Sequence, residues 1–304
     1  MVDWLTKHRR ALLYVLTCLA FAVLLSYTSH PRAQQVVRRP ITSAIAGPDS
    51  IADLELWLPI SALSGADEDE ITTWPDQSGN GRDGTGVADA ITKPLYRTAG
   101  GPSGGPSVEL GLAGIRRGHF TLPNFATGFT SGEIFLVPQV LPDDPPTDSG
   151  VNMGPPAGDW GTGTQSLYPF TDGVIYENWG STVRKTTNNP TTNLTNWVVY
   201  NIRTASGDWS WSINGATSGN DFFSTASNTV AFGTAPRIGT NGRNLNGRIV
   251  EVIFYSRVLN STERFTIHAY LNSTYGFSLP IAKLLPFRRP FERPNYIDLE
   301  QIAA

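Results

Sequence analysis

Short apolar runs alternate with turn-forming clusters over most of the chain. The runs are rich in Val, Ile, Leu and aromatic residues, and they are separated by clusters of Gly, Pro, Asn or Asp. Such segments have the length and composition of β-strands. They span residues 54–58, 71–74, 107–110, 133–140, 173–179, 197–203, 209–213 and 248–255. Their spacing predicts an all-β sandwich or barrel.

The alternation of polar and apolar residues is strictest where serines separate Trp209, Trp211 and Ile213. Successive side chains of a strand point to opposite faces, so both indoles should lie on one face of a sheet. Asn214 and Gly215 follow directly. This dipeptide is a strong signal for a hairpin turn, and we predict one after residue 213.

One stretch near the C-terminus has the periodicity of an amphipathic helix. Asn260 can cap its first turn, and Glu263 can complete a capping box. Apolar side chains then recur on one face, among them Ile267, Leu271 and Tyr275. The following glycine provides a C-terminal stop. We expect this single helix to pack its apolar face on the sandwich.

The first residues follow a different pattern. The basic residues Lys7, Arg9 and Arg10 precede an apolar run over 11–25, which is the order found in a secretory signal. With its neighbours the run also approaches the length of a membrane span. We interpret residues 1–32 as a signal peptide or an N-terminal membrane anchor. The protein is accordingly expected to be exported, to the extracellular space or the cell surface.

Changes in composition divide the remaining chain into three parts. Residues 33–50 are rich in Gln, Arg, Pro, Ser and Gly and form a predicted linker. Residues 51–279 hold all the strand-like runs and the helix, and one sandwich often needs more than roughly 200 residues. In the tail, 280–304, Pro alternates with Arg and Phe. This tail is expected to be extended and to offer a contact for a protein partner.

Charge and cysteine content exclude several classes of function. The formal net charge is −3, and no long basic run interrupts the middle of the chain. Nucleic acid is therefore not an expected partner. The single cysteine, Cys18, lies in the N-terminal apolar run. The exported part consequently has no disulfide and no thiolate for metal binding or catalysis, and its stability depends on the size of its core.

Two glycine motifs resemble loops of enzymes only in their spacing. Residues 79–84 match a dinucleotide-binding loop, but no helical period follows them. Residues 101–105 place Ser103 as in a nucleophile elbow, but they lead to a strand rather than to a helix. We interpret both motifs as turns.

Asp76, Asn80 and Asp83 form a candidate metal site. Alternating oxygen side chains can converge on a hard cation such as Ca²⁺, and glycine permits the sharp turn between them. The position at which a calcium loop carries a bidentate Glu is Val87. Two alternatives remain: a calcium site, or turn residues hydrogen-bonded to the backbone. No other cofactor is expected.

Three short motifs occur in a characteristic order. They are Leu56-Trp57-Leu58 leading to residues 74–81 (WPDQSGNG), residues 105–110 (GPSVEL) and residues 247–255 (GRIVEVIFY) before the predicted helix. This ordered set resembles the concanavalin A-like, laminin-G-like jelly-roll family. The resemblance implies an all-β, two-sheet antiparallel jelly-roll sandwich with one short C-terminal α-helix. It also implies carbohydrate or other surface ligands, calcium in some relatives and glycan hydrolysis in others.

The chain departs from that family at two positions. Pro59 stands where an acidic residue often follows the Trp-Leu pair, which removes an implied metal ligand. Glu109 occupies a position at which an apolar residue is usual. The packing around Glu109 is therefore a specific question for the structure.

The candidate ligand-binding residues are two tryptophans and their neighbours. An indole stacks on the apolar face of a sugar ring, while amide and carboxylate groups bind its hydroxyls. Trp160 and Asp159 lie in the long Gly- and Asp-rich loop 142–166, and Asn178 and Trp179 lie at a strand end. We expect both indoles to be exposed; the alternative is that they plug the ends of the sandwich. The tryptophans expected in the core are Trp57, Trp74, Trp197 and one or both of Trp209 and Trp211.

These observations lead to a preferred hypothesis and two alternatives. The preferred one is an exported or surface-anchored, non-catalytic module that binds a glycan or another cell-surface ligand. The first alternative is a structural or adhesive surface or virion protein that uses the jelly roll as a scaffold. The second is a glycoside hydrolase, which needs two suitably spaced carboxyl groups. Its candidates are Asp53 with Glu55 on the first strand, and Glu251, which has no acidic neighbour on its own strand.

Overall fold

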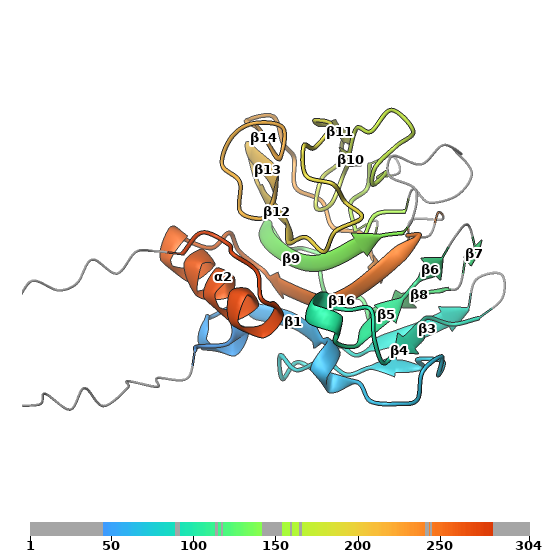
Figure 1. Ribbon diagram of the computed structural model, residues 1–304. Helices are drawn as coiled ribbons and strands as arrows, with labels where there is room; N and C mark the ends of the chain where they lie inside the picture. Colours follow the sequence, from blue (N-terminus) through green and yellow to red (C-terminus); the bar gives the residue numbers. More distant parts are fainter. Residues whose placement is uncertain are drawn as a thin grey trace, which may run out of the picture. The chain divides into compact units, whose positions relative to one another are not determined.

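The structure is a computed structural model (Figure 1). It describes residues 45–281 except 89–91, 113–114, 117, 142–153, 159, 164–165, 241–242 and 244. The predicted signal or anchor, most of the linker and nearly all of the C-terminal tail lie outside the described residues. Within the described ranges, no helix is both long enough and apolar enough to cross a membrane.

An eight-stranded antiparallel sheet forms the larger part of the fold (Figure 1). Its strands follow the order β14-β13-β12-β9-β16-β5-β4, and β1 also pairs with β16. Strand β16 thus pairs with β9 along one edge and with β1 and β5 along the other. The strands are β1 (Leu54–Pro59), β4 (Leu95–Arg97), β5 (Ser107–Glu109), β9 (Ser131–Val140), β12 (Tyr200–Ala205), β13 (Asp208–Ile213), β14 (Phe222–Thr225) and β16 (Gly247–Tyr255).

A four-stranded antiparallel sheet accompanies it, in the order β15-β8-β3-β2. Its strands are β2 (Thr73–Trp74), β3 (Gly84–Ala88), β8 (Gly118–Thr121) and β15 (Arg237–Ile238). Two further strand pairs are β6 (Gly111–Leu112) with β7 (Ile115–Arg116), and β10 (Tyr176–Glu177) with β11 (Lys185–Thr186). The helical elements are η1 (Pro48–Ser50), η2 (Ile60–Ala62), η3 (Pro102–Gly104) and α2 (Ser261–Tyr275).

The two main sheets share one hydrophobic core. Trp74 of β2 and Phe120 of β8 are fully buried, with ring centroids 5.2 Å apart. They belong to the same apolar cluster as Leu136 of β9 and Phe254 of β16. The described part of the chain is therefore an all-β arrangement of antiparallel sheets around one core, with one α-helix, and the coarse fold prediction is confirmed.

The helix α2 forms as its caps predict. The Asn260 side chain accepts hydrogen bonds from the backbone N–H groups of Thr262 and Glu263, and the Glu263 side chain accepts one from Asn260 N. Gly276 ends the helix with a φ of 75°. The helix packs on one face of the larger sheet, where its His268 ring lies 6.4 Å from the Phe135 ring of β9.

The predicted strands agree best where the apolar runs are long. The runs 133–140 and 248–255 correspond to β9 and β16, which are buried along almost their whole length. The run 173–179 fails, because it contributes only the two residues of β10. Its first residue, Gly173, has a φ of 80° and closes a turn onto Phe170 O. Because of this turn, the strand begins only at Tyr176.

The hairpin prediction is only partly correct. Asn214 and Gly215 have φ values of 52° and 71°, and Ala216 N closes a turn onto Ile213 O at 3.0 Å. The next strand, β14, which pairs with β13, nevertheless begins only at Phe222. The two-residue hairpin lies at the other end of β13, where Ser206 and Gly207 connect it to β12. Asn-Gly therefore forms the turn but leads into a longer connection.

Neither glycine motif precedes a helix of the kind that its enzymatic interpretation requires. Residues 79–84 lead into strand β3. Residues 101–105 form the short η3 and then lead into strand β5. Their interpretation as turns is consistent with this geometry.

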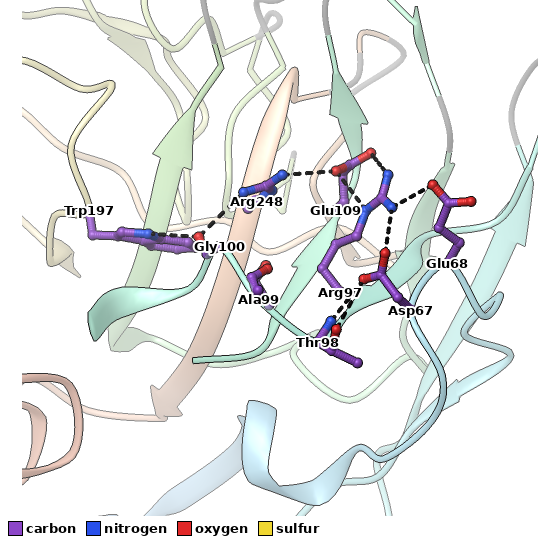
Figure 2. A network of polar contacts seen from close by, with 10 residues as sticks. Asp67, Glu68, Arg97, Thr98, Ala99, Gly100, Glu109, Trp197 and Arg248 are labelled. Atoms are coloured by element: carbon purple, nitrogen blue, oxygen red, sulfur yellow. Dashed lines mark hydrogen bonds and ion pairs between the residues drawn. The ribbon is translucent and has the colours of Figure 1, made fainter. Parts of the chain in front are cut away.

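The tryptophans predicted in the core separate into two groups. Trp74, Trp209 and Trp211 are buried to 1% exposure or less. Trp57 and Trp197 are only half-buried, which corrects the prediction for these two. Each of them donates a hydrogen bond from its indole N–H at the edge of the core. Trp57 donates to Glu251 Oε1, and Trp197 donates to the backbone carbonyl of Gly100 (Figure 2).

Glu109 is accommodated by two arginines (Figure 2). Its side chain is fully buried. Arg97 of the neighbouring β4 donates Nε to Oε2 at 2.9 Å and Nη2 to Oε1 at 3.0 Å, and Arg248 of β16 donates to Oε2 at 3.3 Å. Arg97 continues outward to the exposed carboxylates of Asp67 and Glu68. A charged residue is tolerated at this buried position because the flanking strands supply its partners.

Candidate functional site

One face of the larger sheet carries polar side chains at neighbouring positions. Asn201 and Arg203 alternate with apolar residues on β12, and Ser212 and Ser210 lie directly opposite them on β13. Directly opposite residues of an antiparallel pair project from the same face. The four side chains therefore form one polar patch, and the intervening residues of both strands point to the core.

The helix α2 and the loop after β13 turn this patch into a pocket. The cavity has a volume of about 510 Å³, within the usual range for small-molecule sites. The polar patch forms its floor, and Arg264, Phe265 and His268 of α2 form one wall. Ala216 and Phe222 complete the opposite strand side. Two phenyl rings and several polar groups thus border one cavity.

The charge of Arg264 is neutralised behind the wall of the pocket. Its guanidinium donates Nε to Glu133 Oε1 at 2.7 Å and Nη2 to Oε2 at 3.0 Å. Glu133 is fully buried and also accepts hydrogen bonds from Asn201 Nδ2 and from Leu259 N. This network fixes the start of α2 against β9 and β12. It also holds Asn201 and Arg264 in the orientation that lines the cavity.

Arg203 has a different environment. Its Nε donates to Ser210 Oγ at 2.8 Å. Within the described part of the chain, no carboxylate lies within salt-bridge distance of Arg203, and none of the residues that line the pocket is Asp or Glu. Among the described residues, the guanidinium of Arg203 in the pocket therefore has no carboxylate in contact with it.

His268 lines the pocket as a hydrogen-bonded, buried ring. Its Nδ1 lies 2.7 Å from Pro280 O. A carbonyl oxygen only accepts, so Nδ1 carries the proton and Nε2 is the acceptor of the neutral ring. Burial lowers the pKa of His268, with a further contribution from the charge of Arg264. The ring is therefore neutral at physiological pH.

The predicted exposure of Trp160 and Trp179 is wrong, because both indoles are fully buried. Their ring centroids lie 5.8 Å apart, and each packs against Phe254 of β16, at 5.3 and 5.5 Å. Trp160 Nε1 donates to Arg237 O at 2.7 Å. The segments that carry these tryptophans fold back over the core, and the indoles fill it. A buried indole has no free face for a sugar.

The neighbours of these tryptophans do not form a surface site either. Asn178 is fully buried, and its Oδ1 accepts a hydrogen bond from Ser166 Oγ at 2.8 Å. Asp159 lies outside the described residues. The pocket lining does not include Trp160, Trp179 or Asn178.

Asp76 of the candidate metal site is the centre of a hydrogen-bonded turn. Its Oδ1 accepts from the backbone N–H groups of Trp57 and Ser78, both at 2.9 Å. Its Oδ2 accepts from Ser78 Oγ and from Arg82 N. Two hydrogen bonds on each oxygen use the lone pairs that a cation would need. This carboxylate does not fit a calcium ligand unless the turn rearranges.

The other two members of the candidate metal site also bond to the backbone. Asn80 donates Nδ2 to Leu54 O at 2.9 Å, and Asp83 Oδ1 accepts from Asp76 N at 2.8 Å. In the described ranges, no group of three or more His, Cys, Asp or Glu side chains is arranged to hold a metal ion. The three residues come together as predicted, and their contacts stabilise the turn before β3.

The carboxyl groups considered for hydrolysis are engaged by other side chains. Asp53 precedes β1 with a φ of 64° and pairs with Arg257 at 2.8 Å. Glu55 forms an ion pair with Arg82 and accepts from Ser256 Oγ. Glu251 is fully buried, away from both. None of the three lines the pocket.

The sequence contains a signal for the pocket that the search for tryptophans misses. Asn201 and Arg203 on β12, like Ser210 and Ser212 on β13, occupy every second position opposite apolar neighbours. This pattern identifies a polar sheet face. Whether such a face is open to solvent or bordered by a helix depends on where α2 packs. The alternation of polar and apolar residues carries no information about that packing.

Comparisons with protein-family models and with curated proteins give no match. Among solved structures, domain 4 of a GH43 extracellular arabinanase from Geobacillus stearothermophilus, in complex with arabinotriose, is similar with 17% identity and a TM-score of 0.46. The alignment covers 71% of this chain and 97% of that domain.

Two further similar structures are whole enzymes. A Trypanosoma rangeli sialidase mutant aligns with 16% identity and a TM-score of 0.43, over 75% of this chain and 34% of the sialidase. A GH54 α-L-arabinofuranosidase mutant aligns with 14% identity and a TM-score of 0.45, over 69% of this chain and 52% of the enzyme. The chain thus spans about a third of one and about half of the other.

The prediction that the chain is not an enzyme is corrected by this comparison. The similar structures are of glycoside hydrolases, at 13–17% identity and over part of their length. At this level of similarity they establish neither that this chain is an enzyme nor that it lacks catalytic activity.

Proposed function

We propose that this protein recognises a glycan through a saccharide-binding pocket between the larger sheet and α2. The observation that carries the proposal is the composition of the pocket. Its floor offers the polar groups of Asn201, Arg203, Ser210 and Ser212 beside the rings of Phe222 and Phe265. Saccharides combine many hydroxyls with apolar ring faces, and sites of this mixed kind suit them.

The proposed fold is the concanavalin A-like jelly roll. Its support is the order of the three sequence motifs together with the pairing of the first long strand, β1, with the last, β16. The proposed location is the extracellular space or the cell surface. Its support is the N-terminal order of basic residues followed by an apolar run. A cell-surface glycan is the corresponding class of partner.

The proposal is tested by applying the full-length chain to a glycan array. Ala216 is half-buried and lines the pocket, so we expect Ala216→Trp to occupy part of the cavity. Ala66→Trp is the matched control, because Ala66 is exposed and is not among the residues that line the pocket. We expect at least about tenfold weaker binding for the first variant and unchanged binding for the second.

Two results would contradict the proposal. One is the absence of binding to every glycan on the array by the wild-type chain. The other is undiminished binding by Ala216→Trp, which would place the glycan elsewhere. A reducing-end assay on each bound glycan, with the same variants, separates recognition from hydrolysis.

A further inference from the structure

We infer that the pocket is selective for acidic saccharides and that Arg203 is the group that recognises their negative charge. The inference rests on the proposed saccharide site and adds its ligand class. It follows from the charge of the pocket, from the geometry of the free guanidinium edge and from the way this chain treats its other arginines.

Five other partly buried arginines of the described chain are paired with carboxylates. Arg97 and Arg248 contact Glu109, Arg257 contacts Asp53 and Glu263, Arg82 contacts Glu55, and Arg264 contacts Glu133. Such pairing reduces the cost of holding a charge away from bulk water.

Arg203 breaks this pattern inside a cavity. Its only hydrogen bond among the described residues is to Ser210 Oγ, which is neutral. The pocket contains a second guanidinium, from Arg264, but the buried Glu133 neutralises it. His268 is neutral because burial lowers its pKa. A ligand that enters therefore meets one positive charge that has no contacting counter-ion among the described residues.

The hydrogen bond to Ser210 also fixes the orientation of the guanidinium. It uses the Nε–H, so the donors on both Nη atoms are left for a ligand. The Nη donors of one guanidinium lie in a plane and match the oxygens of a carboxylate or sulfate group. A neutral sugar would use these donors less well, because its hydroxyls are weaker acceptors than an anionic oxygen.

The test compares matched saccharides on the full-length chain. The probes are one oligosaccharide in three forms: neutral, with a uronate carboxylate and with a sulfate ester. We expect the wild-type chain to bind an acidic form about 10- to 100-fold more tightly than the neutral form. The form that binds more tightly, uronate or sulfate, identifies the anionic group. The preference should weaken as salt is added.

Arg203→Gln should weaken the binding of the acidic form far more than that of the neutral form, and so remove most of this preference. Arg203→Lys should keep part of it, because the charge remains but the planar donor pair is lost. Arg237→Gln is the matched control. Arg237 is also a half-buried strand arginine without a salt bridge among the described residues, and it lies outside the pocket.

The outcomes separate the inference from the proposed function. Equal binding of neutral and acidic forms by the wild-type chain would overturn the inference and leave the saccharide site intact. An equal loss for both forms in Arg203→Gln would also overturn it, since Arg203 would then serve binding without selecting charge. Failure to bind any form would contradict the proposed function itself. Thermal melting of each variant verifies that it is folded.

Discussion

Trp57 and Glu251 lie 194 positions apart in the sequence, and the indole Nε1 of Trp57 donates a 2.6 Å hydrogen bond to Glu251 Oε1. Tyr270 of α2 donates to the same oxygen at 3.1 Å. Tyr275 contacts Oε2 and also donates to Val250 O. One buried carboxyl group therefore connects β1, β16 and α2.

This arrangement suits the neutral acid. Burial raises the pKa of Glu251 to about 8, although the three donors oppose the shift. A protonated Oε2 can donate to the Tyr275 oxygen, which leaves the Tyr275 hydroxyl hydrogen for Val250 O. Every polar hydrogen then has an acceptor. No basic side chain forms a salt bridge with Glu251 within the described ranges.

The first prediction is that the contribution of Glu251 to stability falls as pH rises between about 4.5 and about 8. The pKa of Glu251 is about 8 in the folded protein and 4.5 in the reference state. The folded state therefore binds more protons than the unfolded state in this interval. The stability that Glu251 contributes is fully present below pH 4.5 and is lost as the pH rises through about 8. Urea denaturation at several pH values measures the slope. Glu251→Gln should reduce the slope and be more stable than wild type at pH 8; an unchanged slope would contradict this.

The second prediction concerns the buried network at Glu109. Glu109→Ala leaves Arg97 and Arg248 without their buried partner, and we expect a loss of about 3 kcal/mol or more in the free energy of unfolding. Glu68 belongs to the same network, but its side chain is 68% exposed. Glu68→Ala should cost at most about 1 kcal/mol. Similar losses in the two variants would show that burial does not decide the contribution.

The third prediction is that Trp160 and Trp179 contribute to the stability of the fold. Replacing either with Ala removes a fully buried indole and should cost about 3–5 kcal/mol. The replacement by Phe should cost less, because most of the volume is retained. Denaturant unfolding measures both. Variants that kept their stability but lost glycan binding would instead support exposed, ligand-stacking indoles.

The fourth prediction concerns calcium. Since Asp76 accepts three hydrogen bonds from its own turn and one from Trp57 N of β1, removal of calcium with a chelator should leave the melting temperature unchanged. Asp76→Ala should lower it, because the four donors lose their acceptor. Calcium-dependent melting that Asp76→Ala abolishes would establish the metal site instead.

The strands that could be predicted are those whose side chains fill the core. β9 and β16 are long and apolar, and α2 has both caps in the sequence, so local chemistry suffices. β3 could not be predicted, because its glycines have the composition of a turn. A Cβ on Gly86 would lie 1.9 Å from Ile71 O. Glycine is needed there because two backbone segments meet, a requirement that only the folded sheet reveals.

The candidate site was harder to predict for a related reason. The indoles of Trp160 and Trp179 had the expected chemistry for sugar binding, but their burial depends on distant residues such as Phe254. Conversely, Arg203 is unremarkable in the sequence. It becomes a candidate because Glu133, its register partner on β9, is already bound by Arg264. Competition between arginines for one acid is a tertiary property.

The pairing of β1 with β16 has a consequence for biosynthesis. Leu54 pairs with Tyr255, so the first long strand has no partner until nearly the whole domain has left the ribosome. Contacts between such distant segments form slowly. The nascent chain should therefore expose its apolar strands to chaperones for longer than a helical protein of similar length would.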